Sequence, residues 1–295
     1  MMRRHRHRLS VVSSYLIRLL VAALLLLVIP VTMAQTPAKS ELQVRCEALM
    51  LSGATHLQKK ENDQAIEDFS EVIRLAPGTA DMYLARGTAH FNKHEDQKAV
   101  KDFTDAIRLQ TTADMVYGLR GVSNLRLKEF DKAIADFSEF LRREPKNATT
   151  YGYRSQAFKR KEDYDSALAD LNEAIKLDPN NGTFYEARSE IYLAKKDYDH
   201  VIVDATEGIR LNLKSLGVYL YRGEALFYKG DFQNAISDLS EVIRRDPAGV
   251  RAYALRGQAY RKVGREDLAK LDEQKMEEIK KAAELKKDEE LKPKQ

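Results

Sequence analysis

The sequence predicts an all-α protein, an α-solenoid built from stacked helix pairs. A short motif that begins with Tyr and continues with Arg and then Gly or Ser returns every 34 residues, without insertion or deletion. Its copies begin at Tyr83, Tyr117, Tyr151, Tyr185, Tyr219 and Tyr253. A repeat of this length is too small to bury its own apolar face, so such repeats are stable only when they stack on their neighbours.

A second motif with the same period predicts a second helix in each repeat. A mostly Ala column comprises Ala65, Ala99, Ala133, Ala167, Val201, Ala235 and Ala269. Four residues later comes a mostly apolar column: Phe69, Phe103, Phe137, Leu171, Ala205 and Leu239. Because positions i and i+4 share one face of a helix, these columns form an apolar stripe.

Small residues and prolines complete the pattern of a helix pair. The first helices carry Gly53, Gly87, Gly121, Ser155, Ser189, Gly223 and Gly257, which let two backbones approach closely. Pro77, Pro145, Pro179 and Pro247 follow the second helices. Proline has no N–H and disfavours helix in the residue before it, so we expect each second helix to end there.

In period and residue pattern, the chain resembles the tetratricopeptide repeat family. The resemblance covers residues 46–279 as seven repeats that begin at Cys46, Ala80, Asp114, Ala148, Gly182, Leu216 and Val250. It implies a right-handed superhelix that binds a protein or peptide in its concave groove. Repeat 5 departs from the pattern at Val201, Gly208 and Leu213, so we expect it to be the loosest joint. Repeat 7 has Glu273 in the Phe column, which predicts a polar cap.

The first 34 residues resemble a secretory signal peptide. Arg3, Arg4, Arg6 and Arg8 precede an apolar run from Leu19 to Ile29, and small residues allow cleavage before Gln35. The prediction is therefore an exported protein, in a bacterial periplasm or secreted, with the endoplasmic reticulum lumen as the alternative. An uncleaved membrane anchor, counted from Val11, is a further alternative.

The remaining boundaries follow from local composition. Residues 35–45 are predicted to be a linker and the start of the first helix, with Ser40 as its cap. Residues 280–295 are predicted to be a charged, disordered tail, because the end of the chain is too polar to pack.

The charge balance and the absence of catalytic motifs exclude several classes of function. The full chain has a net charge of +4, but five arginines lie in residues 1–34, which leaves 44 basic against 45 acidic side chains in the rest. We therefore predict no nucleic-acid partner.

Cys46 is the single cysteine. His90 and His94 are spaced for a shared metal but lack a third ligand, so packing is favoured. No cofactor, metal or catalytic group is predicted, and the chain is not expected to be an enzyme.

Two charged columns predict a ladder of ion pairs. The basic column comprises Arg86, Arg120, Arg154, Arg188, Arg222 and Arg256, and the acidic column Asp68, Asp102, Asp136, Asp170, Asp204 and Asp238. Whether each Arg meets the Asp of its own repeat or of the preceding one stays open. Repeat 1 has Ser52 in the Arg column, so one Asp is expected to be unpaired.

The resemblance also implies a partner site. In this family the second, fifth, ninth, twelfth and thirteenth residues of each repeat face the groove. They predict apolar anchors at Leu57, Leu84, Phe91 and Leu125, a basic stretch at Arg126, Lys159 and Arg160, and an acidic stretch at Glu186, Glu190 and Glu224. Gly118 and Gly152 either make room for a ligand backbone or serve packing.

Two functions of different classes fit these observations. The first is an exported, non-catalytic scaffold that binds a peptide or protein of unknown identity. The alternative is an accessory subunit of an envelope-assembly or enzymatic complex whose chemistry lies on another chain. A membrane contact is expected only if the N-terminal segment is retained as an anchor.

Overall fold

The computed structural model describes residues 39–211 and 213–290, and all regular secondary structure in these ranges is helical. The helices fall into two compact units, the first up to Pro145 and the second from Lys146. The first unit contains α2 (Glu41–Lys59), α3 (Asn62–Leu75), α4 (Ala80–Asn92), α5 (Asp96–Arg108), α6 (Met115–Arg126) and α7 (Phe130–Arg143). The second contains α8 (Ala148–Arg160), α9 (Tyr164–Leu177), α10 (Gly182–Ala194), α11 (Tyr198–Arg210), α12 (Leu216–Tyr228), α13 (Phe232–Arg245), α14 (Val250–Lys262) and α15 (Glu266–Glu290).

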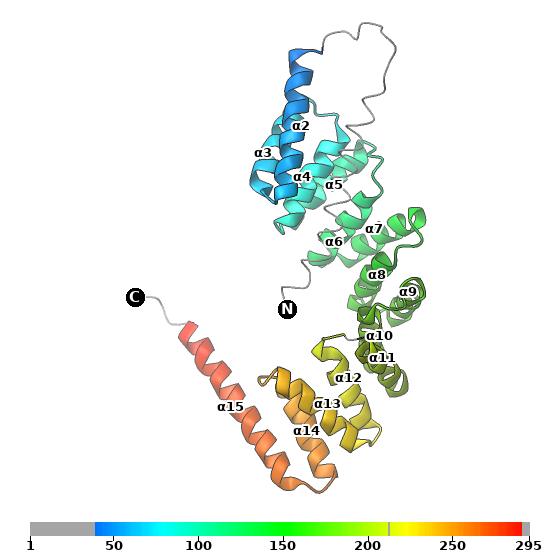
Figure 1. Cartoon of the computed structure of the whole chain (residues 1–295), viewed down its shortest axis with the longest axis vertical. Helices are drawn as coiled ribbons and strands as arrows, with labels where there is room; N and C mark the ends of the chain where they lie inside the picture. The colour runs from blue at the N-terminus through cyan, green and yellow to red at the C-terminus, as the bar shows by residue number, and fades with distance from the viewer. Residues whose placement is uncertain (1–38, 212, 291–295) are drawn as a thin grey trace. The chain divides into compact units, whose positions relative to one another are not determined.

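The first compact unit is three helix pairs in chain order (Figure 1). Within each pair the rings of Phe69, Phe103 and Phe137 are fully buried. They face the small residues of the first helices: a Cβ added at Gly121 would lie 2.6 Å from the Phe137 ring. Glycine is therefore needed in α6 for the ring of α7 to pack, which is the close approach that the sequence predicts.

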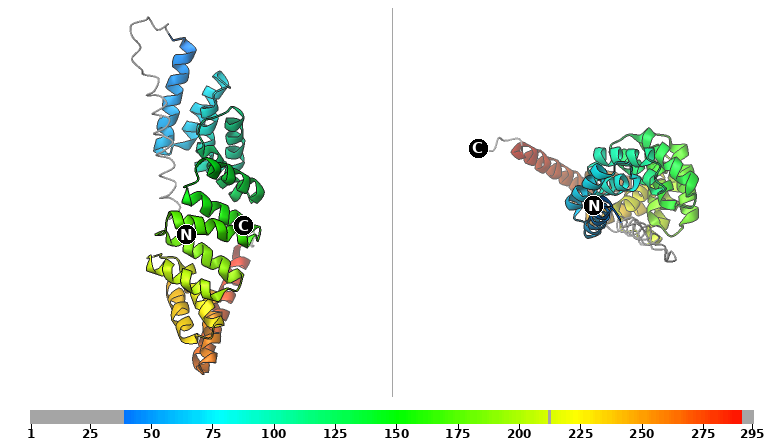
Figure 2. Two further views of the ribbon diagram at one scale, coloured as in Figure 1. Left: turned by 90° about the vertical axis from the view of Figure 1, so that its right-hand side faces the viewer. Right: turned by 90° about the horizontal axis from the view of Figure 1, so that it is seen from above.

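The second compact unit is four helix pairs, α8 with α9 through to α14 with α15 (Figure 2). Neighbouring pairs pack on each other through α9 and α10, α11 and α12, and α13 and α14. Leu171 and Leu239 take the place of the buried Phe rings. Leu239 belongs to a core cluster with Val242, Ala252 and Leu255, so this core runs across the junction between two repeats.

Most predicted boundaries agree with the helices. The second helices α3, α7, α9 and α13 each end two residues before Pro77, Pro145, Pro179 and Pro247. Ser40 caps α2 as predicted, because its hydroxyl accepts from the Gln43 N–H while the Gln43 side chain accepts from the Ser40 N–H. Glu273 is half exposed at the end of the array, as expected of a terminal cap.

One prediction is corrected. The chain does not become disordered at residue 280, since α15 continues to Glu290. This segment consists almost entirely of Ala, Leu, Lys, Glu and Asp, and most of these residues favour helix without a packing partner. On the side of repeat 6, repeat 5 is closely packed: a Cβ added at Gly208 would lie 3.0 Å from Val218, so the small residue brings α11 close to α12.

The predicted signal peptide and its cleavage site lie outside the described residues. Within the described ranges, no helix has the length and apolar character needed to span a membrane.

Candidate partner-binding surface

The two charged columns meet within each repeat. Arg86 Nη2 lies 2.8 Å from Asp102 Oδ1, sixteen residues later, and the next four arginines repeat this contact at 2.6 to 2.8 Å. The pairs are Arg86 with Asp102, Arg120 with Asp136, Arg154 with Asp170, Arg188 with Asp204, Arg222 with Asp238, and Arg256 with Asp272. The carboxylates are almost completely buried, whereas each guanidinium stays about one fifth exposed.

The same arginines also reach the preceding repeat. Arg86 Nη1 donates to the Ser70 hydroxyl at 3.1 Å, and Arg188 Nη1 donates to the Asn172 side chain at 2.6 Å. Equivalent bonds join Arg120 to Thr104, Arg222 to Thr206 and Arg256 to Ser240. The sequence left open which repeat supplies the partner of each Arg. In the structure its carboxylate partner belongs to the same repeat, and its neutral acceptor belongs to the preceding repeat.

Asp68 has a partner, contrary to the prediction that one Asp would be unpaired. His56 Nδ1 lies 2.9 Å from Asp68 Oδ2. In repeat 3 Asn124, from the same column as His56, donates to Asp136 at 2.9 Å. The polar residues in this column were the signal that could have predicted the contact.

Three of the four predicted apolar anchors lie in the core. Leu57, Leu84 and Phe91 are 1, 4 and 3% exposed, so packing is their role in this structure. Leu57 packs with the first and second repeats, and Leu84 and Phe91 with the second and third. Leu125 is half-buried. These side chains face inward because they fill the cores shared by neighbouring repeats.

Phe91 and Arg126 are brought together. The Arg126 guanidinium lies 4.1 Å from the centre of the Phe91 ring, and its Nη1 lies 3.1 Å from Asp96 Oδ1. A cation over a ring and an ion pair reinforce each other at a partly buried site. Arg126 thus covers Phe91 and joins repeat 3 to repeat 2.

The other two predicted basic residues lie in the second compact unit. Lys159 Nζ lies 2.7 Å from Glu190 Oε2, so it joins α8 to α10. Arg160 is exposed, and no carboxylate of the described residues lies within ion-pair distance of it. Of the predicted basic stretch, Arg160 is the residue with a cation available to a partner.

The predicted acidic stretch surrounds a tyrosine. Glu186 accepts from the Ser215 hydroxyl, and Glu224, which is nearly buried, pairs with Arg251 of the next repeat. Burial, together with the nearby carboxylates of Glu190 and Glu186, raises the pKa of Tyr221 above its ordinary range. The hydroxyl of Tyr221 therefore stays neutral among these charges.

Tyr228 is a candidate contact that was not singled out from the sequence. It is 55% exposed at the end of α12, and its ring stacks on Tyr198 with centres 5.0 Å apart. It occupies the thirteenth position of repeat 6, as Arg160 does in repeat 4. An aromatic residue at that position was the available signal.

The two interior glycines differ. A Cβ at Gly152 would lie 2.8 Å from the Phe184 ring, so Gly152 serves packing against the next repeat. A Cβ at Gly118 would meet Phe140 at 3.7 Å, an ordinary contact, so nothing in the described structure requires glycine there.

Comparison with known families identifies the repeats. The model of the tetratricopeptide repeat matches residues 51–114, 119–182, 154–200 and 220–274. The chain belongs to the tetratricopeptide repeat family. Its helix pairs, buried Phe columns and terminal prolines are those of such repeats. A comparison with curated proteins finds no significant match.

Solved structures share the tetratricopeptide fold at low identity. A tetratricopeptide repeat protein from Parabacteroides merdae is 19% identical, with a TM-score of 0.61 over 80% of this chain and 93% of that one. Pseudomonas aeruginosa PilF is 13% identical, with a TM-score of 0.59 over 72% of this chain and 97% of PilF. MamA from Desulfovibrio magneticus is 18% identical, with a TM-score of 0.56 over 58% and 98%. These likenesses support the fold.

Proposed function

We propose that this tetratricopeptide repeat protein is an exported, non-catalytic scaffold that binds a peptide or protein segment along the first helices of its second compact unit. The carrying observation is the pattern of exposure. At the ligand-facing positions of repeats 4 to 7 the side chains of Gln156, Arg160, Tyr228, Gln258 and Lys262 are exposed. At the ninth position, which Gln156 and Gln258 hold in repeats 4 and 7, repeats 1 and 2 have Ala54 and Thr88, and both are buried. The twelfth residues Leu57 and Phe91 and the fifth residue Leu84 of these early repeats are buried as well.

The chemistry of this surface supports a polypeptide partner. Tyr228 offers an exposed ring already held in place by Tyr198, so a contact with it costs little side-chain entropy. Arg160 offers a cation for a carboxylate of the partner. The pairs Lys159 with Glu190 and Arg251 with Glu224 fix the neighbouring helices, so the surface is preorganised.

Export remains part of the proposal. Its support is the sequence of residues 1–34, with arginines before a short apolar run and small residues at its end. N-terminal sequencing of the protein isolated from its native cell tests this part. A mature chain beginning at Gln35 is expected, and retention of residues 1–34 would contradict cleavage.

The binding surface is tested with a captured partner. The full-length chain is used to capture proteins from the native compartment, and the affinity of the captured partner is then measured for Arg160→Glu and Tyr228→Ala. Each change is expected to weaken binding at least severalfold, because both side chains are exposed and make little contribution to folding. Lys101→Glu, an exposed charge change on the second helix α5, is the matched control. Unchanged affinity in both variants would place the binding surface elsewhere.

A further inference from the structure

The first helix of the array presents to solvent the face that its counterparts bury. Leu51 and Val44 of α2 are 58 and 54% exposed, and Ala48 between them is exposed as well. In α4 the residues 34 positions later than Ala48 and Leu51 are Met82 and Ala85, and both are 0% exposed, because they pack in the core of the preceding repeat. Within the described residues no helix occupies that place against α2.

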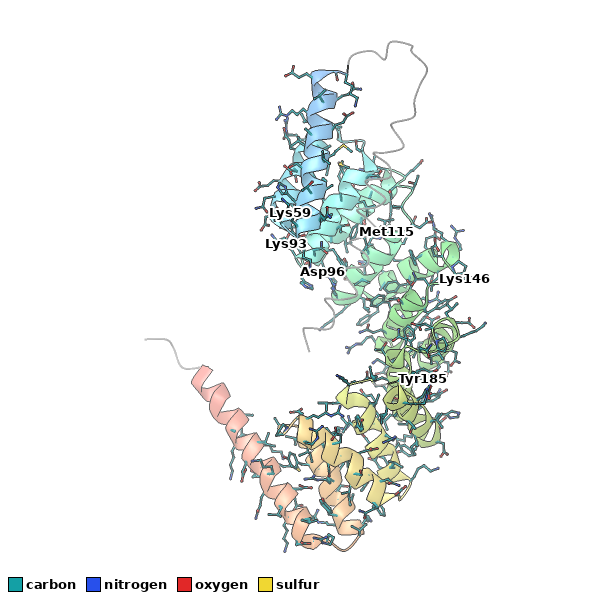
Figure 3. The ribbon with its side chains drawn as sticks, viewed as in Figure 1. Lys59, Lys93, Asp96, Met115, Lys146 and Tyr185 are labelled. Atoms are coloured by element: carbon teal, nitrogen blue, oxygen red, sulfur yellow. The ribbon has the colours of Figure 1, made fainter. Side chains whose placement is uncertain are left out.

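The exposed face of α2 is a straight stripe with opposite charges at its ends. At 100° per residue, Val44, Ala48, Leu51 and Thr55 follow one side of the helix. Glu41 and Lys59 are eighteen residues apart, which is five full turns, so they lie on that same side about 27 Å apart. Glu41 is the first residue of α2, and Lys59 is its last (Figure 3). Neither charge has an ion-pair partner among the described residues.

Such a stripe is complementary to itself when turned end to end. In an antiparallel pair related by a two-fold axis, Glu41 of each copy faces Lys59 of the other. The small residues Ala48 and Ser52 face each other, which allows close approach, and Leu51 of both copies lies near the axis. We propose that α2 pairs with α2 of a second copy of this chain, so that the protein forms a two-fold dimer through its first repeat.

The opposite end of the array argues against head-to-tail stacking. Ile236 and Leu239 of α13 are buried where repeat 7 packs on repeat 6. Their counterparts 34 residues later in α15 are Lys270 and Glu273, and both are exposed. The apolar stripe of α2 would gain little from packing on the charged face of α15, so the α2 helix of a second copy is the better partner. One helix pair buries less area than a standard interface, so the dimer has modest affinity and weakens with salt.

Charge reversal and its compensation test the pairing directly. Sedimentation equilibrium of the full-length protein over a concentration series at low salt is expected to show monomer and dimer in exchange. Glu41→Lys or Lys59→Glu alone turns two attractions into two repulsions and should weaken the dimer about tenfold. The double variant E41K/K59E restores both opposite pairs and should recover the original affinity. Leu51→Glu should abolish the dimer.

Controls separate this surface from a general effect. Lys101→Glu changes the charge by the same amount away from α2 and should leave the dimer unchanged. All substituted side chains are exposed, so the helical circular dichroism should match the original in every variant. A protein that stays monomeric at about 100 µM and low salt, far above a micromolar dissociation constant, overturns the proposal, and so does a double variant that remains as weak as either single one.

Discussion

Arg188 shows the two tasks of the arginines in the ladder. Two of its nitrogens hold the nearly buried Asp204 of the same repeat, and the third reaches the Asn172 amide of the preceding repeat. The hydrogen bonds to Asp204 raise the pKa of Arg188, so this cation is fixed at any physiological pH. The fork of donors on one guanidinium explains why Lys is absent from this column.

Removing one Asp of the ladder should destabilise the protein strongly. Asp204→Asn leaves the guanidinium of Arg188, which is only about one fifth exposed, without its countercharge, and we expect a loss of about 3 kcal/mol in the free energy of unfolding. Urea unfolding followed by circular dichroism measures it. Glu173→Gln is the control, because its pair with Lys176 is exposed and should contribute nothing measurable. Equal losses of stability in the two variants would show that the ion pairs of the ladder contribute no more than an exposed surface pair.

Replacing Ser123 by alanine should stabilise the protein. Its side-chain oxygen is fully buried and has no hydrogen-bond partner among the described residues. Other repeats carry Ala89, Ala157 and Ala225 in this column. We expect Ser123→Ala to raise the stability by about 1 kcal/mol, since it removes an unsatisfied polar group. Ser155→Ala, which removes a hydroxyl that donates to the Gly152 carbonyl, should not stabilise. A loss of stability in Ser123→Ala would reveal a missed partner.

At the scale of the helices, the sequence predicts position well and exposure less well. Periodicity and proline placement predict where helices begin and end, because these depend on local chemistry. The anchors Leu57, Leu84 and Phe91 lie on the predicted face, yet neighbouring repeats bury them. Burial depends on how far successive helices separate, which one sequence does not reveal. Tyr228, at the thirteenth position of its repeat, stays exposed.

Two glycines of α6 should respond oppositely to alanine. Gly118→Ala places a methyl at an ordinary 3.7 Å from Phe140, so the better helix propensity should raise stability by about 0.5 to 1 kcal/mol. Gly121→Ala places it 2.6 Å from the Phe137 ring, so the core must shift and stability should fall by about 1 to 3 kcal/mol. Thermal and urea unfolding compare the two. The same sign for both would mean that contact with the Phe rings does not decide the effect.

At the scale of the whole molecule, ion pairs along the helices predict sensitivity to acid. Hydrogen bonds from Lys98 and then His90 lower the pKa of Glu95 to about 2, and those from Arg142 lower that of Glu139 to about 2. A carboxylate whose pKa is lower in the folded state contributes stability above its unfolded pKa of about 4.3. That contribution is lost as the pH falls from there to about 2.

Urea midpoints at about pH 5 and about pH 2.5 should therefore differ, with the lower value in acid. High salt should shrink the difference, because both carboxylates are partly exposed. The variant E95Q/E139Q should show a smaller acid effect than the original chain. An identical acid effect in that variant would assign the sensitivity to other groups.

The C-terminal helix should divide into a part that stabilises the array and a part that does not. Ala269 and Asp272 in the first half of α15 are buried, and Asp272 holds Arg256 of α14 at 2.6 Å. Deletion from Glu266 onward uncovers the side of α14 that carries Gly257 and strands Arg256, so the second compact unit should lose about 3 kcal/mol or more. Residues 281–284 are exposed, so deletion from residue 281 onward should leave the urea midpoint unchanged. A marked loss from the short deletion would mean that the distal part of α15 packs on the protein, whereas an unchanged midpoint after the long deletion would mean that α14 closes the array by itself.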